Sequence, residues 1–260
     1  KGEGGFPEPE ARMFNTGVNR WRSFDQWPPK DVRKKALSFE AGHKLTFGNP
    51  QNGKTNYNEY VSNPWKPVPY TAHIMDSRTF YYHPYMNEDQ RFAARRPDVL
   101  VFETNPLEKE VTLAGPMLAD LFVSTTGTDA DWVVKLIDVY PDSASDPKPN
   151  PTNVKMGGYQ MLVRGDILRG KYRNYPKKPE PFVPGKVTEI KLPLQDVLHT
   201  FRKGHRIMIQ IQSSWFPFFD VNPQTFTDIY KAKPDDFKKA TQRVWFTGKY
   251  PSKIVVGILK

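Results

Sequence analysis

The stretch that most restricts the fold of this chain is a short run of strict alternation. From residue 206 to residue 213 every second position is an isoleucine, at Ile207, Ile209 and Ile211. The positions between them carry Met208, Gln210 and Gln212. A period of two predicts a β-strand that presents its isoleucine face to a core.

A loop rich in aromatic residues follows this strand directly. It carries Trp215, Phe216, Phe218 and Phe219 around Pro217. Four large aromatic side chains expose too much apolar surface to serve solubility alone. We therefore expect this loop to lie under another element or against a partner surface.

The rest of the chain also favours strands over helices. Its 260 residues include 25 prolines and 17 glycines, which is typical of many turns and few long helices. Strands are predicted at Ala11–Thr16, Ala36–Glu40, Lys44–Phe47, Asp98–Thr104, Val111–Thr126, Ala130–Tyr140, Tyr159–Leu168, Val187–Leu194, Val244–Phe246 and Lys253–Leu259. We predict an all-β fold, a jelly-roll β-sandwich with long irregular loops.

Several segments between these strands are predicted to be irregular. A loop is expected around Arg20 and Trp21, and turns are expected throughout 48–70. Residues 71–97 are predicted to form a long loop with one short strand near 79–82. One short helix is expected at Pro234–Ala240, with proline at its start.

Charge and composition exclude several classes of protein. The net charge is +10, but the basic residues are scattered among acidic ones and form no nucleic-acid-binding motif. No apolar run approaches the ~20 residues of a membrane span. The chain has no cysteine, so it has no disulfide framework, and both the cytoplasm and the exterior of the cell remain possible locations.

The sequence by itself shows no active site. No serine lies in a G-x-S-x-G turn, and the five histidines form no metal-binding pair. His199 and His205 are interpreted as structural. Asp129 and Asp131 resemble half of a calcium loop but lack its remaining ligands, so a turn before a strand is the better interpretation. We therefore expect no catalytic residue, no metal and no cofactor.

Several motifs together resemble one family of hydrolases. They are F-N-T-G-V-N-R-W-R with W-P-P at 14–29, N-P-W-K-P-V-P-Y at 63–70, D-Q-R at 89–91, R-P-D-V-L-V-F at 96–102, D-A-D-W-V-V-K-L-I-D-V-Y-P-D at 129–142, K-G-H-R-I with S-S-W-F-P and N-P-Q-T at 203–225, and P-S-K-I-V-V-G-I-L at 251–259. This pattern resembles the C-terminal domain of the cocaine esterase, α-amino-acid ester hydrolase and X-Pro dipeptidyl-peptidase family. Glutaryl-7-aminocephalosporanic acid acylase-like members are similar too.

The resemblance implies that the chain is part of a larger enzyme. Family members join an α/β-hydrolase domain with a Ser-Asp-His triad to a C-terminal galactose-binding-like jelly roll. Residues 1–10 are then a connector and residues 11–260 the jelly roll, without any triad residue. The chain also begins at Lys1 without an initiator methionine, which agrees with a piece of a longer protein.

The resemblance also implies roles for individual residues. The segment that matches the wall of the substrate cleft comprises Tyr70, Thr71, Ala72 and His73. The candidates for contact with the hydrolase domain are Arg20, Trp21, Trp215, Phe216, Phe218 and Phe219. Each of these side chains has a plainer alternative role, in a docked loop or in the core of the domain itself.

Two other functions remain open at this stage. Jelly rolls are shared with carbohydrate-binding modules, which present exposed aromatic rings beside polar groups. The same aromatic loop is also compatible with a contact surface in a homo-oligomer. The direction in which the rings at 215–219 point distinguishes a flat sugar platform from a surface that docks on another domain.

Overall fold

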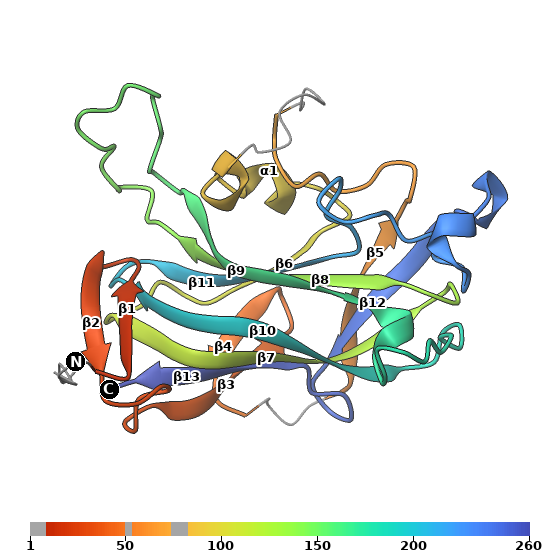
Figure 1. Ribbon diagram of the computed structural model, residues 1–260, viewed down its shortest axis with the longest axis horizontal. Coiled ribbons are helices and arrows are strands. Elements are labelled where there is room, and N and C mark those ends of the chain that lie inside the picture. Colours follow the sequence, from red (N-terminus) through yellow and green to blue (C-terminus); the bar gives the residue numbers. More distant parts are fainter. Residues whose placement is uncertain (1–8, 50–53, 74–82) are drawn as a thin grey trace, which may run out of the picture.

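The computed structural model describes residues 9–49, 54–73 and 83–260. Residues 1–8 of the connector predicted at 1–10 lie outside these ranges, and so does the short strand predicted near 79–82. Two β-sheets lie face to face across one core (Figure 1). The prediction of an all-β sandwich is confirmed.

The first sheet is built around one long strand, β7. Its strands are β7 (Val111–Thr125), β10 (Thr188–Phe201), β13 (Lys253–Leu259), β12 (Ala240–Phe246), β3 (Arg33–Glu40) and β5 (Asn56–Ser62). β7 pairs with β10 along one edge, and with β13 and then β12 along the other. β3 continues the sheet beyond β13, and β5 continues it beyond β12.

The second sheet runs in the order β6, β11, β8 and β9. These strands are β6 (Leu100–Glu103), β11 (Arg206–Gln212), β8 (Asp131–Val139) and β9 (Gln160–Arg169). β4 (Lys44–Phe47) forms a hairpin with β3 and a single parallel bridge to β6, which links the two sheets at one edge.

The strand predicted at 111–126 contains Gly115-Pro116, a pair that is compatible with one strand or with two. The structure has a single strand that bends there. Gly115 has φ +89°, a conformation open to glycine, and a Cβ on it would lie 2.9 Å from Pro28. The pairing of β7 with β10 and with β13 shifts register beside this residue, as in a β-bulge.

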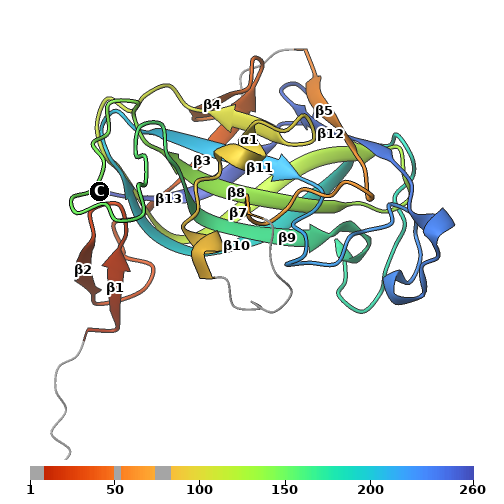
Figure 2. The ribbon, with the colours of Figure 1, turned by 90° about the horizontal axis from the view of Figure 1, so that it is seen from above.

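Two segments predicted to be irregular are strands. β2 (Arg20–Phe24) pairs with β1 (Ala11–Asn15) in a separate hairpin that projects from the sandwich (Figure 2). In β5 (Asn56–Ser62) only Tyr60 and Ser62 are buried. The alternation is therefore weak, and the Asn and Glu residues of this segment are unfavourable in strands, so the sequence did not predict it.

The helical content is small. The helical elements are η1 (His83–Met86), α1 (Arg91–Ala94), η2 (Gly170–Tyr172), η3 (Ile229–Lys231) and η4 (Pro234–Asp236). The helix predicted at 234–240 is only the single turn η4, because β12 already begins at Ala240. Among the described residues, no helix is long and apolar enough to cross a membrane.

The second sheet is buried on both of its faces. Toward the first sheet it presents Trp132, Leu136 and the three isoleucines of β11, as the alternation predicts. Every residue of β8 is buried, including those that point away from this core. A cover made of residues 63–73, 83–99 and 214–219 lies over the outer face of β8 and β11 and carries α1.

Candidate functional site

Two segments far apart in the sequence meet in this cover. The Tyr70 amide donates to the Phe216 carbonyl at 2.9 Å, and the Phe216 amide donates to the Val68 carbonyl at 3.0 Å. The Ser214 hydroxyl accepts a bond from the Val68 amide at 2.8 Å. The structure therefore joins the residues predicted to line a cleft with the aromatic loop predicted to contact another domain.

The rings of these two segments pack into one aromatic cluster. We use that name for Tyr70, Trp215, Phe218 and Phe219, for Tyr85 of η1, whose ring packs with theirs, and for Phe216, which is joined to them through its backbone bonds. The Phe218 ring lies 5.3 Å from Trp215, 4.7 Å from Phe219 and 5.3 Å from Tyr85, between ring centroids. Phe218 meets Trp215 and Phe219 edge to face, the geometry that aromatic pairs prefer.

The members of the aromatic cluster differ sharply in exposure. Phe216 and Phe218 are 42% and 47% exposed, whereas Trp215 is 4% exposed. Of the residues predicted to contact another domain, Trp215 is therefore the one that lies inside this domain. It packs with Val133 on the outer face of β8 and leaves Phe216 and Phe218 at the surface.

The segment 70–73 passes from buried to exposed. Tyr70 and Thr71 are buried, and Ala72 and His73 are exposed. Glu88 holds the exposed end, because its carboxylate accepts from the Ala72 amide at 3.1 Å and lies 3.5 Å from His73 Nε2. Ala72 and His73 thus reach solvent on the same cover as the two exposed phenylalanines.

A lysine lies beneath the aromatic cluster with no exposed surface. Lys135 comes from β8, and its Nζ donates to Gln90 Oε1 at 3.0 Å. Nζ also lies 4.9 Å from the Trp215 ring and 6.0 Å from the Phe92 ring. Burial lowers the pKa of Lys135 to about 7, and the field of Glu88 opposes this only in part.

The last two predicted residues lie elsewhere, on the projecting hairpin. Trp21 is 62% exposed, and its ring lies 5.5 Å from Phe14 and 5.8 Å from the Arg12 guanidinium. Arg20 is exposed at the start of β2. Figure 1 shows this hairpin at one end of the sandwich, whereas the cover lies over the middle of the second sheet. The structure does not bring Arg20 and Trp21 together with the aromatic cluster.

Comparison with known proteins identifies the kind of domain. A sequence model of the X-Pro dipeptidyl-peptidase C-terminal non-catalytic domain matches residues 5–255. The chain belongs to this family.

Relatives of this X-Pro dipeptidyl-peptidase C-terminal domain are larger proteins. A cocaine esterase from Rhodococcus sp. is 29% identical over 97% of the chain, which spans 42% of that relative. An aminopeptidase from a marine sediment Thaumarchaeota archaeon has a TM-score of 0.90 and 44% identity, and the match covers 98% of this chain and 41% of the aminopeptidase. An α-amino acid ester hydrolase has a TM-score of 0.87 and 41% identity, and the match covers 96% of this chain and 41% of the hydrolase.

A hydroxyl, an imidazole and a carboxylate do line up within this non-catalytic domain. Thr16 Oγ1 lies 2.8 Å from His199 Nδ1, and His199 Nε2 lies 3.2 Å from Asp138 Oδ2. His199 and Asp138 are completely buried, and the Thr16 hydroxyl is also bonded to the Leu198 carbonyl. A substrate has no access to this imidazole, so the arrangement is structural.

His205 completes the same buried cluster, donating from Nδ1 to Asp138 Oδ1 at 2.8 Å. Burial alone would raise the pKa of Asp138, but the bonds from the two histidines outweigh it and hold that pKa below its ordinary value. Both histidines that sequence reasoning interpreted as structural therefore bind one carboxylate between the sheets.

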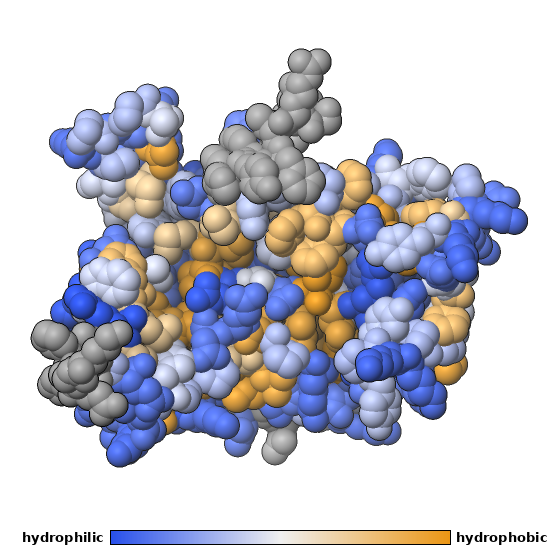
Figure 3. Space-filling view, in the orientation of Figure 1, coloured by the Kyte–Doolittle hydropathy of each residue, from blue (hydrophilic) through white to orange (hydrophobic). Residues whose placement is uncertain are grey.

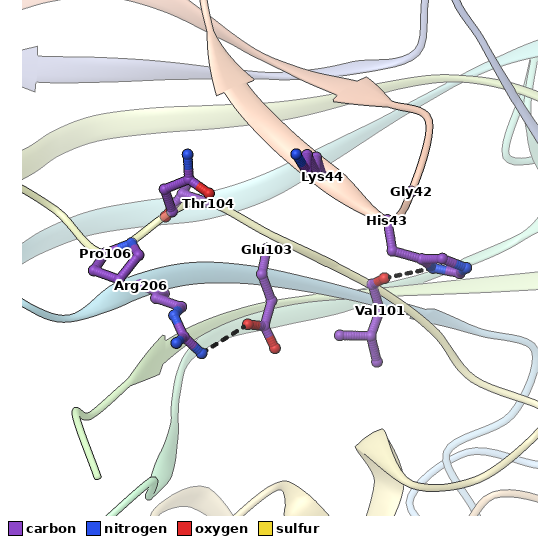
Figure 4. Close-up of a pocket in the computed structure, with 9 residues that line it drawn as sticks. Gly42, His43, Lys44, Val101, Glu103, Thr104, Pro106 and Arg206 are labelled. Atoms are coloured by element: carbon purple, nitrogen blue, oxygen red, sulfur yellow. Dashed lines mark hydrogen bonds and ion pairs between the residues drawn. The ribbon is translucent and has the colours of Figure 1, made fainter.

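A shallow cavity of about 440 Å³ lies beside β4 and β6 (Figure 4). Arg206 and Glu103 face each other there at 3.5 Å, and His43 Nδ1 contacts the Val101 carbonyl at 2.9 Å. The other ring nitrogen of His43 contacts the Asn58 amide, so the ring holds the β3–β4 turn in place. Within the described ranges no group of three or more histidine and carboxylate side chains is arranged to hold a metal ion.

Proposed function

We propose that this chain is the C-terminal β-sandwich domain of a serine hydrolase that cleaves esters or amides. In this proposal it packs on an α/β-hydrolase domain of the same polypeptide, and the aromatic cluster with Ala72 and His73 forms part of the substrate-cleft wall. The activated serine and the covalent acyl-enzyme belong to that other domain. No cofactor is required of the present chain.

The observation that carries the proposal is the pairing of segments 68–73 and 214–219. Phe216 is held by backbone bonds to Val68 and Tyr70, Phe218 is held by ring contacts with Trp215, Phe219 and Tyr85, and both side chains stay exposed. Aromatic side chains are enriched in surfaces that dock on another protein domain. Figure 3 shows hydrophobic surface near the middle of the face viewed, with hydrophilic loops on both sides.

The same geometry favours docking over sugar binding. Carbohydrate platforms need ring faces that lie flat and open to solvent. Here the Phe218 ring stands at 79° to Trp215 and at 74° to Phe219, so these rings do not form one flat platform. A homo-oligomer contact is an alternative outcome of the experiment below.

The test is hydrolysis of a p-nitrophenyl ester by the chain alone, by the separately expressed hydrolase domain, and by their mixture. We expect no turnover by the chain alone, and higher turnover in the mixture than with the hydrolase domain alone. Phe216→Ala with Phe218→Ala should weaken that gain, whereas Tyr230→Ala, at an aromatic ring 85% exposed elsewhere, should not.

Two results would contradict the proposal. Turnover by the chain alone that survives Thr16→Val and stops with a serine-directed inhibitor would reveal a nucleophile in this domain. Equal stimulation by the double alanine variant would mean that docking uses another surface. Sedimentation of the chain alone distinguishes the oligomer alternative, because a dimer would persist without the hydrolase domain.

A further inference from the structure

Lys135 connects both segments of the proposed cleft wall. On one side its Nζ lies under Trp215, which begins the loop 215–219. On the other side Nζ donates to the side-chain oxygen of Gln90. The side-chain nitrogen of Gln90 in turn donates to the backbone carbonyl of Glu88 at 3.0 Å. Glu88 then holds Ala72 and His73 through its carboxylate. One side chain thus supports the two segments that the proposed function places beside the substrate.

The strand positions beside Lys135 are shaped to accept the indole. Gly165 of β9 lies opposite Lys135 on one side, and Gln210 of β11 lies opposite it on the other. A Cβ on Gly165 would lie 3.2 Å from Trp215 and 3.3 Å from the Lys135 side chain. Glycine at this position therefore lets the tryptophan close directly over the lysine.

The elements packed around Lys135 offer its charge little compensation. Gln90 and Phe92 come from the cover, Gly165 from β9, Gln210 from β11 and Trp215 from the loop, and none of them is charged. Among the described residues no carboxylate lies within ion-pair distance of Nζ, and Glu88 is the charged group whose field reaches it. An ammonium ion enclosed in this way is unfavourable compared with one in water.

The cover is also imperfectly bonded at this place. Trp215 Nε1, Gln210 Oε1 and Gln212 Oε1 are buried without a hydrogen-bond partner among the protein groups described. When the loop 215–219 opens, these atoms can bond to water, and those bonds offset part of the free energy that opening costs. Regions of this kind open more readily than a fully bonded core.

We propose that Lys135 is a positioning residue that links closure of the loop 215–219 to release of a proton. The inference rests on the proposed function for its meaning, since it describes how the cleft wall is regulated. In the closed wall Trp215 and Gln90 enclose a neutral amine. When the loop opens, water reaches Nζ and the amine takes up a proton.

The direction of the pH effect on loop closure follows from which state binds the extra proton. With the loop closed the pKa of Lys135 is about 7, and in the open state it returns toward the ordinary lysine value of about 10.4. Between these values the open state holds one more proton than the closed state. Raising the pH through this window therefore favours the closed wall, by up to about tenfold per pH unit.

Native-state hydrogen exchange of the chain itself tests this inference. The reporting amides are those of Tyr70, Phe216 and Phe219, which are bonded within or between the two segments. We expect their protection factors to be nearly constant well below pH 7 and to rise about fiftyfold between pH 7 and pH 9. In Lys135→Met protection should be independent of pH, and Lys135→Gln should behave in the same way.

Three controls separate Lys135 from other groups. Lys191→Met removes an exposed lysine and should leave the rise unchanged. His73→Gln and Glu88→Gln remove an imidazole and a carboxylate beside the wall, and the rise should persist in both. A flat profile in the wild type, or a rise retained in Lys135→Met, would overturn the proposal. The experiment needs no hydrolase domain, so failure to dock in the turnover assay leaves this result unaffected.

Discussion

Lys135 and Asp138 lie three residues apart on β8, both fully buried, on opposite faces of one strand. Asp138 faces the core between the sheets and accepts bonds from His199 and His205 on its two oxygens. Lys135 faces the cover and has one amide oxygen and two rings around it. The same strand thus carries one well-compensated charge and one lysine whose charged form is poorly compensated.

The difference separates the scaffold of the domain from its adjustable part. The Asp138 cluster joins β8 to β10 and, through Thr16, to the end of the N-terminal hairpin. Each of its members has partners, so rearranging it breaks several bonds at once. The cover over Lys135 can move without disturbing this core, which suits a surface that closes against a partner or a substrate.

The largest effect is expected from Asp138→Ala, which leaves two buried imidazoles without their acceptor. We expect a loss of roughly 3–5 kcal/mol in the free energy of unfolding, the range for breaking a buried pair. Urea denaturation at pH 7 measures it. Glu189→Ala breaks the exposed pair with Lys191 and should cost under about 1 kcal/mol. Equal losses in the two variants would show that the Asp138 cluster contributes no more than a surface pair.

The acid dependence of stability should follow the same carboxylate. Its pKa is lowered in the folded state, so its stabilisation is complete above the unfolded value of about 3.9 and is lost as the pH falls through the folded value. Urea midpoints of the wild type should therefore decline below about pH 4 more steeply than those of Asp138→Ala. Parallel declines would assign acid sensitivity to other carboxylates.

Lys135→Met should raise the free energy of unfolding, whereas Asp138→Ala should lower it. Methionine fills a similar volume without a charge to desolvate, so we expect a gain of roughly 1–4 kcal/mol at pH 6. The pKa of Lys135 is lowered in the folded state, so the wild type gains stability as the pH rises from about 7 toward the unfolded lysine value. The gap between the two proteins should narrow over that range. A gap that is constant with pH would mean that the lysine is not titrating in the fold.

Sequence reasoning recovered most of the strands but not this contrast. The alternation at 206–213 and the apolar runs predicted β11, β8 and β13, because those patterns are local. Which face of β8 is buried depends on the cover, which comes from residues distant in the sequence. Lys135 stands inside the run V-V-K-L-I-D-V, and a charge within an apolar run was the available signal for a buried lysine.

The same limit explains the partial prediction of the candidate site. Resemblance supplied segment 70–73, and aromatic content supplied loop 215–219, but nothing local to either indicated that they pair. The backbone bonds between Val68, Tyr70 and Phe216 are a product of the tertiary fold. β2 was missed because Arg20–Phe24 packs only one weakly apolar face on the sandwich, and its tryptophan points outward.

The smallest effect is expected from Gly165→Ala, which changes only the contact between Lys135 and its tryptophan. The backbone at Gly165 suits any residue, but the new methyl group must displace Trp215 by a few tenths of an ångström. We expect a loss of about 1 kcal/mol in the free energy of unfolding, at the low end for overpacking. Protection should fall at the Phe216 and Tyr70 amides. The β11 amides near Ile207, the residue that pairs with Asp138, should keep their protection. If both sets lost protection equally, the cover and the core would be one cooperative unit, and the division drawn between the two faces of β8 would fail.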